Sequence, residues 1–406
     1  MKPGDTFLIP DGIGTHLNCV LDSAQKMPYQ SVDQLQKVLV QKVFHYAKDS
    51  KKAAGRALGT LVEIITFYML KSWGFEHSVA IERALAEYGN PDITHNVEYS
   101  LHPILRQERL VFPHKLPLNA TRILENVDEK IFSLVDFAKS DRVLLSREGV
   151  LRNSCVIANG KSSHLVATLD SIQRDRVKIE IVEQYRRPYA IFECKRVGVE
   201  EGMKKGPQTI EKAKQGAYVA KSLSSMHKLR TASGELRGLV YRADQTIYSK
   251  PYAELLAEIV SSNDADLLHD FILTVGVVSN HGNWFTSENH NKELKVLAQS
   301  YDWLLFLTDS GLSEFITELL LEPAPLLEPA RNAFLASYAK ERIKNQFTKV
   351  QIDYRADQVL QRYFKDKADR IEKWFNIIGP PRGTMKALKA ELSQLRQKNW
   401  TVVHSL

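Results

Sequence analysis

The sequence YAIFECKR, Tyr189 to Arg196, combines an apolar strand with two opposite charges at its end. Successive side chains of a strand point to opposite faces of a sheet, so Glu193 and Lys195 project from the same face. Phe192 and Cys194 then point into a core on the other face. A carboxylate beside an ammonium can hold a divalent cation and orient a water molecule. This stretch therefore predicts both a strand of a buried sheet and a catalytic site.

The residues before this strand predict two more strands. Residues 164–173 (HLVATLDSIQ) and 177–184 (VKIEIVEQ) are rich in β-branched residues, and polar turn segments separate them. We expect these runs and 189–196 to form an antiparallel meander. Residues 235–242 and 301–308 also have the composition of strands.

Helical patterns surround these strands. They cover residues 28–55, 56–71, 208–228, 251–275 and 311–321. Residues 103–150 are expected to be helix and loop. The sequence thus predicts an α/β fold, with a mixed central sheet of about five strands flanked by helices and with additional helical regions.

A metal site needs a second carboxylate, and two positions compete for it. If residues 185–188 close a hairpin, Glu180 falls opposite Glu193. Asp170 lies one strand further back, 23 residues before Glu193. A shift of one residue in strand pairing moves every side chain to the other face, so the sequence leaves both open.

Asp170, a spacer of strands and then Glu193-x-Lys195 together resemble the PD-(D/E)XK nuclease superfamily, in which type II restriction endonucleases are prominent. The helix at 56–71 resembles the first core helix of that family and carries Glu63 as its acidic residue. The helix at 208–228 resembles the helix that follows the catalytic strand. The resemblance covers about residues 55–245 and implies a restriction-endonuclease-like core.

The Pro-Asp part of the family pattern is not matched at Asp170, because Leu169 precedes it. A Pro-Asp pair does occur at Pro91–Asp92. It lies 101 residues before Glu193, which is too far for the usual hairpin. We therefore expect Asp170 rather than Asp92 to be the metal ligand.

The resemblance implies a function. Asp170 and Glu193 would bind Mg2+, and Lys195 would activate the water that attacks a phosphodiester of double-stranded DNA. The expected activity is that of a type II restriction enzyme, acting as a homodimer beside a cognate DNA methyltransferase. One alternative is a repair or anti-phage effector nuclease of the same superfamily. The other is a non-catalytic DNA-binding protein in which Glu193 and Lys195 are an ordinary ion pair.

Charge and composition indicate three regions. The chain has 406 residues and a formal net charge of +7, and residues 331–400 alone hold 16 Lys and Arg against 7 Asp and Glu. Three prolines in residues 322–330 mark a boundary before this segment. We expect an N-terminal helical arm at 1–54, a catalytic core with insertions at 55–321 and a basic helical region at 331–406. A basic region attracts polyanions such as DNA.

Other classes of protein are disfavoured. No apolar run approaches the roughly 18–20 uncharged residues that span a bilayer, and no secretory signal is evident. Three scattered cysteines are too few for a disulfide framework. We expect a cytoplasmic protein without a membrane segment.

Overall fold

The computed structural model describes residues 32–46, 48–85, 90–91, 96–196, 217–223, 226–242, 244–279, 286–288, 292–338 and 345–405. Its centre is a mixed sheet of six strands. In spatial order these are β1 (Val79–Arg83), β2 (Val97–Leu101), β11 (Ala190–Arg196), β15 (Leu273–Ser279), β16 (Trp303–Leu307) and β18 (Phe375–Gly379). β2 is antiparallel to both of its neighbours, whereas β11, β15 and β16 run parallel to one another. The predicted mixed α/β architecture is confirmed.

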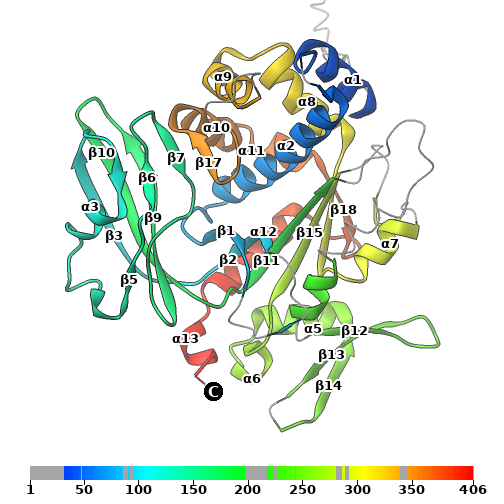
Figure 1. Ribbon diagram of the computed structural model, residues 1–406. Coiled ribbons are helices and arrows are strands. Elements are labelled where there is room, and N and C mark those ends of the chain that lie inside the picture. Colours follow the sequence, from blue (N-terminus) through cyan, green and yellow to red (C-terminus); the bar gives the residue numbers. More distant parts are fainter. Residues whose placement is uncertain are drawn as a thin grey trace, which may run out of the picture.

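Helices cover both faces of this sheet. On one face α2 (Ser50–Ser72) packs against β11, and Phe192 and Cys194 share its hydrophobic core (Figure 1). On the other face a helix at 217–223 and α7 (Lys292–Ala298) pack in a second cluster that includes Ile191. The predicted alternation of side chains along β11 therefore holds.

Residues 102–189 form an insertion between two neighbouring strands of the central sheet. The insertion builds a five-stranded sheet in the order β3 (Ile104–Pro113), β10 (Arg176–Tyr185), β9 (Ser163–Ile172), β8 (Cys155–Asn159) and β5 (Ala138–Lys139). A four-stranded sheet lies beside it, in the order β17 (Gln351–Asp353), β7 (Val150–Arg152), β6 (Val143–Leu145) and β4 (Leu118–Asn119). Both sheets lie to one side of β11 in Figure 1.

The remaining elements complete the layers around the two cores. They are α1 (Val32–Lys42), α3 (Ala120–Leu124), the 3-10 turn Leu134–Asp136, the three-stranded sheet of β12 (His227–Arg230), β13 (Leu236–Tyr241) and β14 (Ile247–Pro251), α5 (Tyr252–Ser261), α6 (Ala265–Leu268), α8 (Asp309–Ile316), the π-helical turn Thr317–Leu321, the 3-10 turn Pro325–Leu327, α9 (Glu328–Ser337), α10 (Tyr354–Asp366), α11 (Ala368–Glu372), α12 (Met385–Arg396) and α13 (Trp400–Val403).

The predicted meander is wrong in its last step. β9 and β10 pair as antiparallel neighbours, but β10 then pairs with β3, and β11 pairs with β2 and β15 instead. Residues 103–150, expected to be helix and loop, contain β3 to β7. β15 falls partly in a predicted helix, because all of its residues are buried and an apolar run without alternation does not distinguish strand from helix.

The predicted boundaries also shift. Gly55 does not break a helix, because α2 begins at Ser50, where the Asp49 carboxylate accepts a hydrogen bond from the backbone N–H of Lys52. The C-terminal region is not a separate unit, since β18 belongs to the central sheet and α10 packs on α2. The first part of the expected arm, residues 1–31, lies outside the described residues, as does most of the helix expected at 208–228.

Among the described residues, α2 is one helix long and apolar enough to cross a membrane. However, 67% of its most apolar window is buried inside the fold. Its burial on the central sheet is what the core helix of a soluble protein would show.

A buried hydrogen-bond network fixes α2 to the C-terminal region. The Asp357 carboxylate on α10 accepts from the Tyr68 hydroxyl at 2.7 Å and from the Lys71 ammonium at 2.9 Å. Asp357 is 1% exposed. Removal of one partner from a buried charged network leaves the other groups without compensation.

We expect Asp357→Ala to lower the free energy of unfolding by about 3–5 kcal/mol, as measured by urea denaturation. The matched control is Asp366→Ala, because Asp366 lies on the same helix and is exposed. That control should change stability by less than about 0.5 kcal/mol. Equal effects of the two substitutions would show that the network does not hold the C-terminal region to α2.

Candidate active site at the end of strand β11

Glu193 and Lys195 lie together at the end of β11, as the sequence predicts. The Lys195 ammonium is 3.5 Å from Oε2 of Glu193. The Lys195 side chain is 28% exposed, whereas that of Glu193 is fully covered. Solvent can therefore reach the pair only from the lysine side.

The neighbouring strands part at this position. The β2–β11 ladder runs from Ala190↔Leu101 to Phe192↔Tyr99 and, among the described residues, ends there. The β11–β15 ladder continues as far as Arg196↔Ser279. In the described part of the chain, β11 thus extends beyond the last residue that pairs with β2, and Glu193 is the first residue after that pairing.

Burial controls the chemistry of Glu193. Removal from water raises the pKa of its carboxyl group to about 7, and the nearby Lys195 ammonium only partly opposes the shift. A carboxyl group with this pKa gains or loses a proton near neutral pH. It would also be readily ionised by a bound cation.

A glycine in the strand beside β11 lies opposite Glu193. Gly276 of β15 is the register partner of Glu193, and a Cβ on Gly276 would lie 2.7 Å from the Tyr301 ring. The absence of a side chain at Gly276 therefore leaves room for the Tyr301 ring. Burial, and then the Glu193 charge, raise the pKa of the Tyr301 hydroxyl.

A second charged cluster lies on the α2 face of the sheet. The Lys349 ammonium, only 7% exposed, is 3.3 Å from Oε2 of Glu63 on α2 and 3.1 Å from Oε1 of Glu82 on β1. It also contacts Oε1 of Glu98 on β2. Glu82 has a φ of 52°, an unusual backbone conformation for a glutamate. The sequence indicated Glu63 but not Lys349, which reaches Glu63 from a position 286 residues further along the chain.

The two clusters lie on either side of the same strand. Cys194, which points away from Glu193, is buried beside Thr66 of α2, and the charge of Glu63 contributes to raising the pKa of its thiol. Burial is the main cause of that shift. Glu63 is therefore close to β11, as the sequence predicts, but its carboxylate is bound to Lys349.

The structure does not bring Asp170 to the Glu193–Lys195 pair. Asp170 is exposed on β9, in the five-stranded sheet of the insertion. Glu180 belongs to the same sheet, where it is paired with Arg109 at 3.2 Å and lies 3.5 Å from His77. Both expectations depended on a hairpin between β10 and β11, and that hairpin is not formed.

Because residues 102–189 are an insertion, the long spacing between Pro91–Asp92 and Glu193 no longer argues against Asp92 as a metal ligand. The 101 residues that separate Asp92 from Glu193 include the five-stranded sheet and three strands of the four-stranded sheet. β2, which begins five residues after Asp92, pairs directly with β11. Asp92 itself lies outside the described residues.

The donor set can be compared with the needs of a metal ion. Among the described residues, no group of three or more His, Cys, Asp or Glu side chains could hold a metal. Mg2+ commonly binds through only one or two carboxylates and keeps several waters. Glu193 supplies one buried carboxylate, so it fits such a site as one of its one or two carboxylate ligands.

Comparison with protein-family models, with curated proteins and with solved structures finds no match to this chain.

The raised pKa of Glu193 predicts a pH-dependent cost of folding. Because the folded pKa is above the unfolded value, stability is lost as pH rises from about 4.5 through 7. Between pH 5 and pH 8, the metal-free wild type should lose roughly 1–3 kcal/mol relative to Glu193→Gln in urea denaturation. Glu254→Gln, at an exposed glutamate of α5, should follow the wild type across this range. Parallel curves for the wild type and Glu193→Gln would contradict the assignment.

Removal of the Lys349 ammonium from its three glutamates should cause a large loss of stability. Lys349→Met leaves Glu63, Glu82 and Glu98 without their shared ammonium, so unfolding should require about 3–5 kcal/mol less free energy. Lys365→Met, at an exposed lysine of α10, is the matched control. An equal midpoint in urea for both variants would contradict the role of Lys349.

Proposed function

We propose that this protein is a metal-dependent endodeoxyribonuclease that cleaves double-stranded DNA at specific sequences. It would be a type II restriction enzyme of the PD-(D/E)XK superfamily. The observation that carries the proposal is the position of Glu193 and Lys195. They project from one face of a central strand, 3.5 Å apart, where its antiparallel neighbour leaves it.

The order of elements around β11 supports the proposal. A helix that carries Glu63 precedes two antiparallel strands, β2 pairs with the strand that carries Glu193-x-Lys195, and a helix at 217–223 follows. This is the order that the resemblance implies, once residues 102–189 are treated as an insertion. Strands β1 and β2 then take the place that the sequence assigned to β9 and β10.

Because β2 rather than β10 is the neighbour of β11, the proposed second metal ligand also changes. We assign it to Asp92 of the Pro91–Asp92 pair, which leads into β2, in place of Asp170. Glu98 is nearer to β11 along the same strand, but its carboxylate contacts Lys349. Asp92 and Glu193 would then be the two carboxylates that bind Mg2+.

Each group has a defined chemical role. Mg2+ bound there would polarise the scissile phosphate and lower the pKa of a bound water. Glu193 would give up its proton to bind the cation, which its pKa of about 7 permits near neutral pH. The Lys195 ammonium would orient the attacking water and stabilise negative charge on the phosphate. The Lys195 side chain is partly exposed whereas that of Glu193 is covered, so DNA would approach from the Lys195 side.

Further expectations accompany this proposal. A two-fold symmetric protein matches a palindromic duplex, so we expect a homodimer. A cytoplasmic location and a cognate methyltransferase that protects host DNA follow from the restriction function alone.

The test is cleavage of unmethylated phage DNA by the purified protein in Mg2+ or in EDTA. Discrete fragments that need Mg2+ are expected for a restriction enzyme, whereas a smear would favour a repair or effector nuclease. DNA binding without cleavage in Mg2+ or Mn2+ would overturn the nuclease proposal and leave a DNA-binding protein.

Three substitutions test the assignment of residues. Lys195→Ala and Asp92→Asn should each reduce the cleavage rate by roughly a hundredfold or more, because each removes a group that acts on the phosphate or its cation. Asp170→Asn is the matched control and should cleave at nearly the wild-type rate, since Asp170 is exposed in another sheet. Loss of activity in Asp170→Asn with full activity in Asp92→Asn would reverse the assignment.

A further inference from the structure

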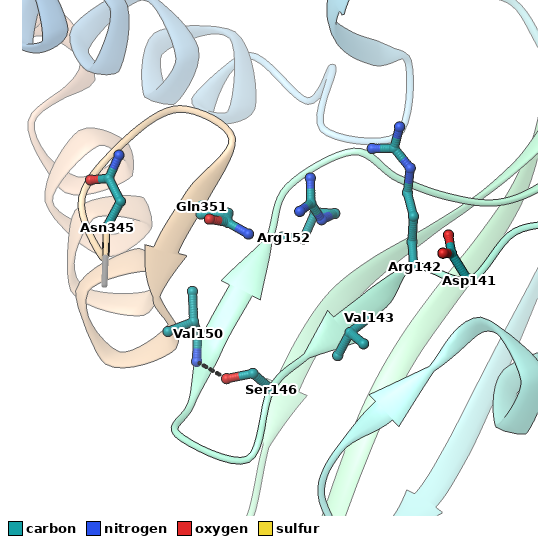
Figure 2. Close-up of a pocket in the computed structure, with 8 residues that line it drawn as sticks. All are labelled: Asp141, Arg142, Val143, Ser146, Val150, Arg152, Asn345 and Gln351. Carbon is teal, nitrogen blue, oxygen red and sulfur yellow. Dashed lines mark hydrogen bonds between the residues drawn. The ribbon is translucent and has the colours of Figure 1, made fainter. Parts of the chain in front are cut away.

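A hollow between the β6–β7 hairpin and β17 is lined by two arginines and does not include Glu193. Its lining residues are Asp141, Arg142, Val143, Ser146, Val150, Arg152, Asn345 and Gln351 (Figure 2). Gln351 of β17 is the register partner of Arg152 on β7, so the β17–β7 ladder forms one wall. The volume of about 510 Å3 is within the range of small-molecule sites.

The charges of this hollow are unbalanced. In the part of the chain that the structure describes, neither the Arg142 nor the Arg152 guanidinium makes an ion pair or a hydrogen bond, although Asp141 lies in the same lining. Some arginines of the insertion do have carboxylate partners, such as Arg106 with Glu183 and Arg109 with Glu180. Burial raises the pKa of the Cys155 thiol, and the charges of Arg152 and Arg142 both oppose that shift.

The polar groups that remain are suited to an anion. The Ser146 hydroxyl is occupied, since it donates to the Glu148 carboxylate and accepts from the backbone N–H of Val150. The side-chain amides of Asn345 and Gln351 are also part of the lining, and Gln351 lies next to Arg152 (Figure 2). Two guanidiniums and two amides offer N–H donors in the planar geometry that recognises phosphate oxygens.

We propose that this hollow binds a phosphate group through Arg142 and Arg152. The phosphate can come from the backbone of duplex DNA or from a free phosphate such as inorganic phosphate or a nucleotide. The DNA source rests on the proposed nuclease function, whereas the free source does not.

An occupant would contact the strand that leads to the Lys349 cluster. Asn153, next to Arg152, donates a hydrogen bond from its side-chain amide to the backbone carbonyl of Lys349 at 3.0 Å. Lys349 in turn holds Glu63, Glu82 and Glu98. Phosphate binding should therefore stabilise the β7–β17 ladder and raise the melting temperature of the whole chain.

The experiment compares Arg142→Gln/Arg152→Gln with Arg147→Gln, a control at an exposed arginine of the same hairpin that does not line the hollow. Two ligands are titrated in EDTA at constant ionic strength. Inorganic phosphate is followed by calorimetry and thermal shift, and a fluorescent 20-base-pair duplex by anisotropy. EDTA prevents cleavage, so the outcome does not depend on catalysis.

The double variant should bind at least one of the two ligands about tenfold or more weakly than the wild type does. The control should have affinities within about twofold of the wild type. Loss of duplex affinity alone would assign the hollow to the DNA backbone, and loss of phosphate affinity alone would assign it to a free phosphate. The proposal is overturned if neither ligand binds saturably, or if the double variant binds both as the control does. A protein that binds phosphate here but never cleaves DNA would refute the nuclease proposal and leave this one intact.

Discussion

The burial of one carboxylate, that of Glu193, is the constraint on which the rest of the site depends. A charged group taken out of water is costly unless another charge compensates it, and here the Lys195 ammonium lies 3.5 Å from the Glu193 carboxylate. The sheet accommodates this group by placing Gly276 opposite it and the Tyr301 ring behind it. Such an arrangement lowers stability near neutral pH, and a bound cation would offset that cost.

The insertion of residues 102–189 explains how a compact site can arise from distant sequence. β2 and β11 are neighbours in space although 88 residues separate the end of one from the start of the other. The inserted sheets bind back to the core through β17, which follows Lys349 and pairs with β7. The basic C-terminal region is likewise used internally, because Lys349 and Lys367 pair with glutamates of the core.

Sequence patterns predicted local structure better than pairing. β9, β10 and β11 each have a strand composition, and the side chains of β11 alternate as expected. Which strands pair is decided by contacts throughout the core, and local sequence does not contain that information. The predicted β10–β11 hairpin, on which the role of Asp170 depended, was therefore wrong. Glu193 and Lys195 were predictable because they are two residues apart. Lys349 and the arginines of the hollow come together only through the tertiary fold.

The central claim is that the Glu193 carboxylate is a metal ligand, and calorimetric titration of the DNA-free protein with Mg2+ tests it most directly. At pH 7 the carboxyl group is partly protonated, so binding should release about half a proton per ion, seen as a dependence of the heat on the buffer. Glu193→Gln should show neither the binding nor the proton release. Mg2+ binding that is unchanged in Glu193→Gln, or no binding by the wild type, would contradict the account.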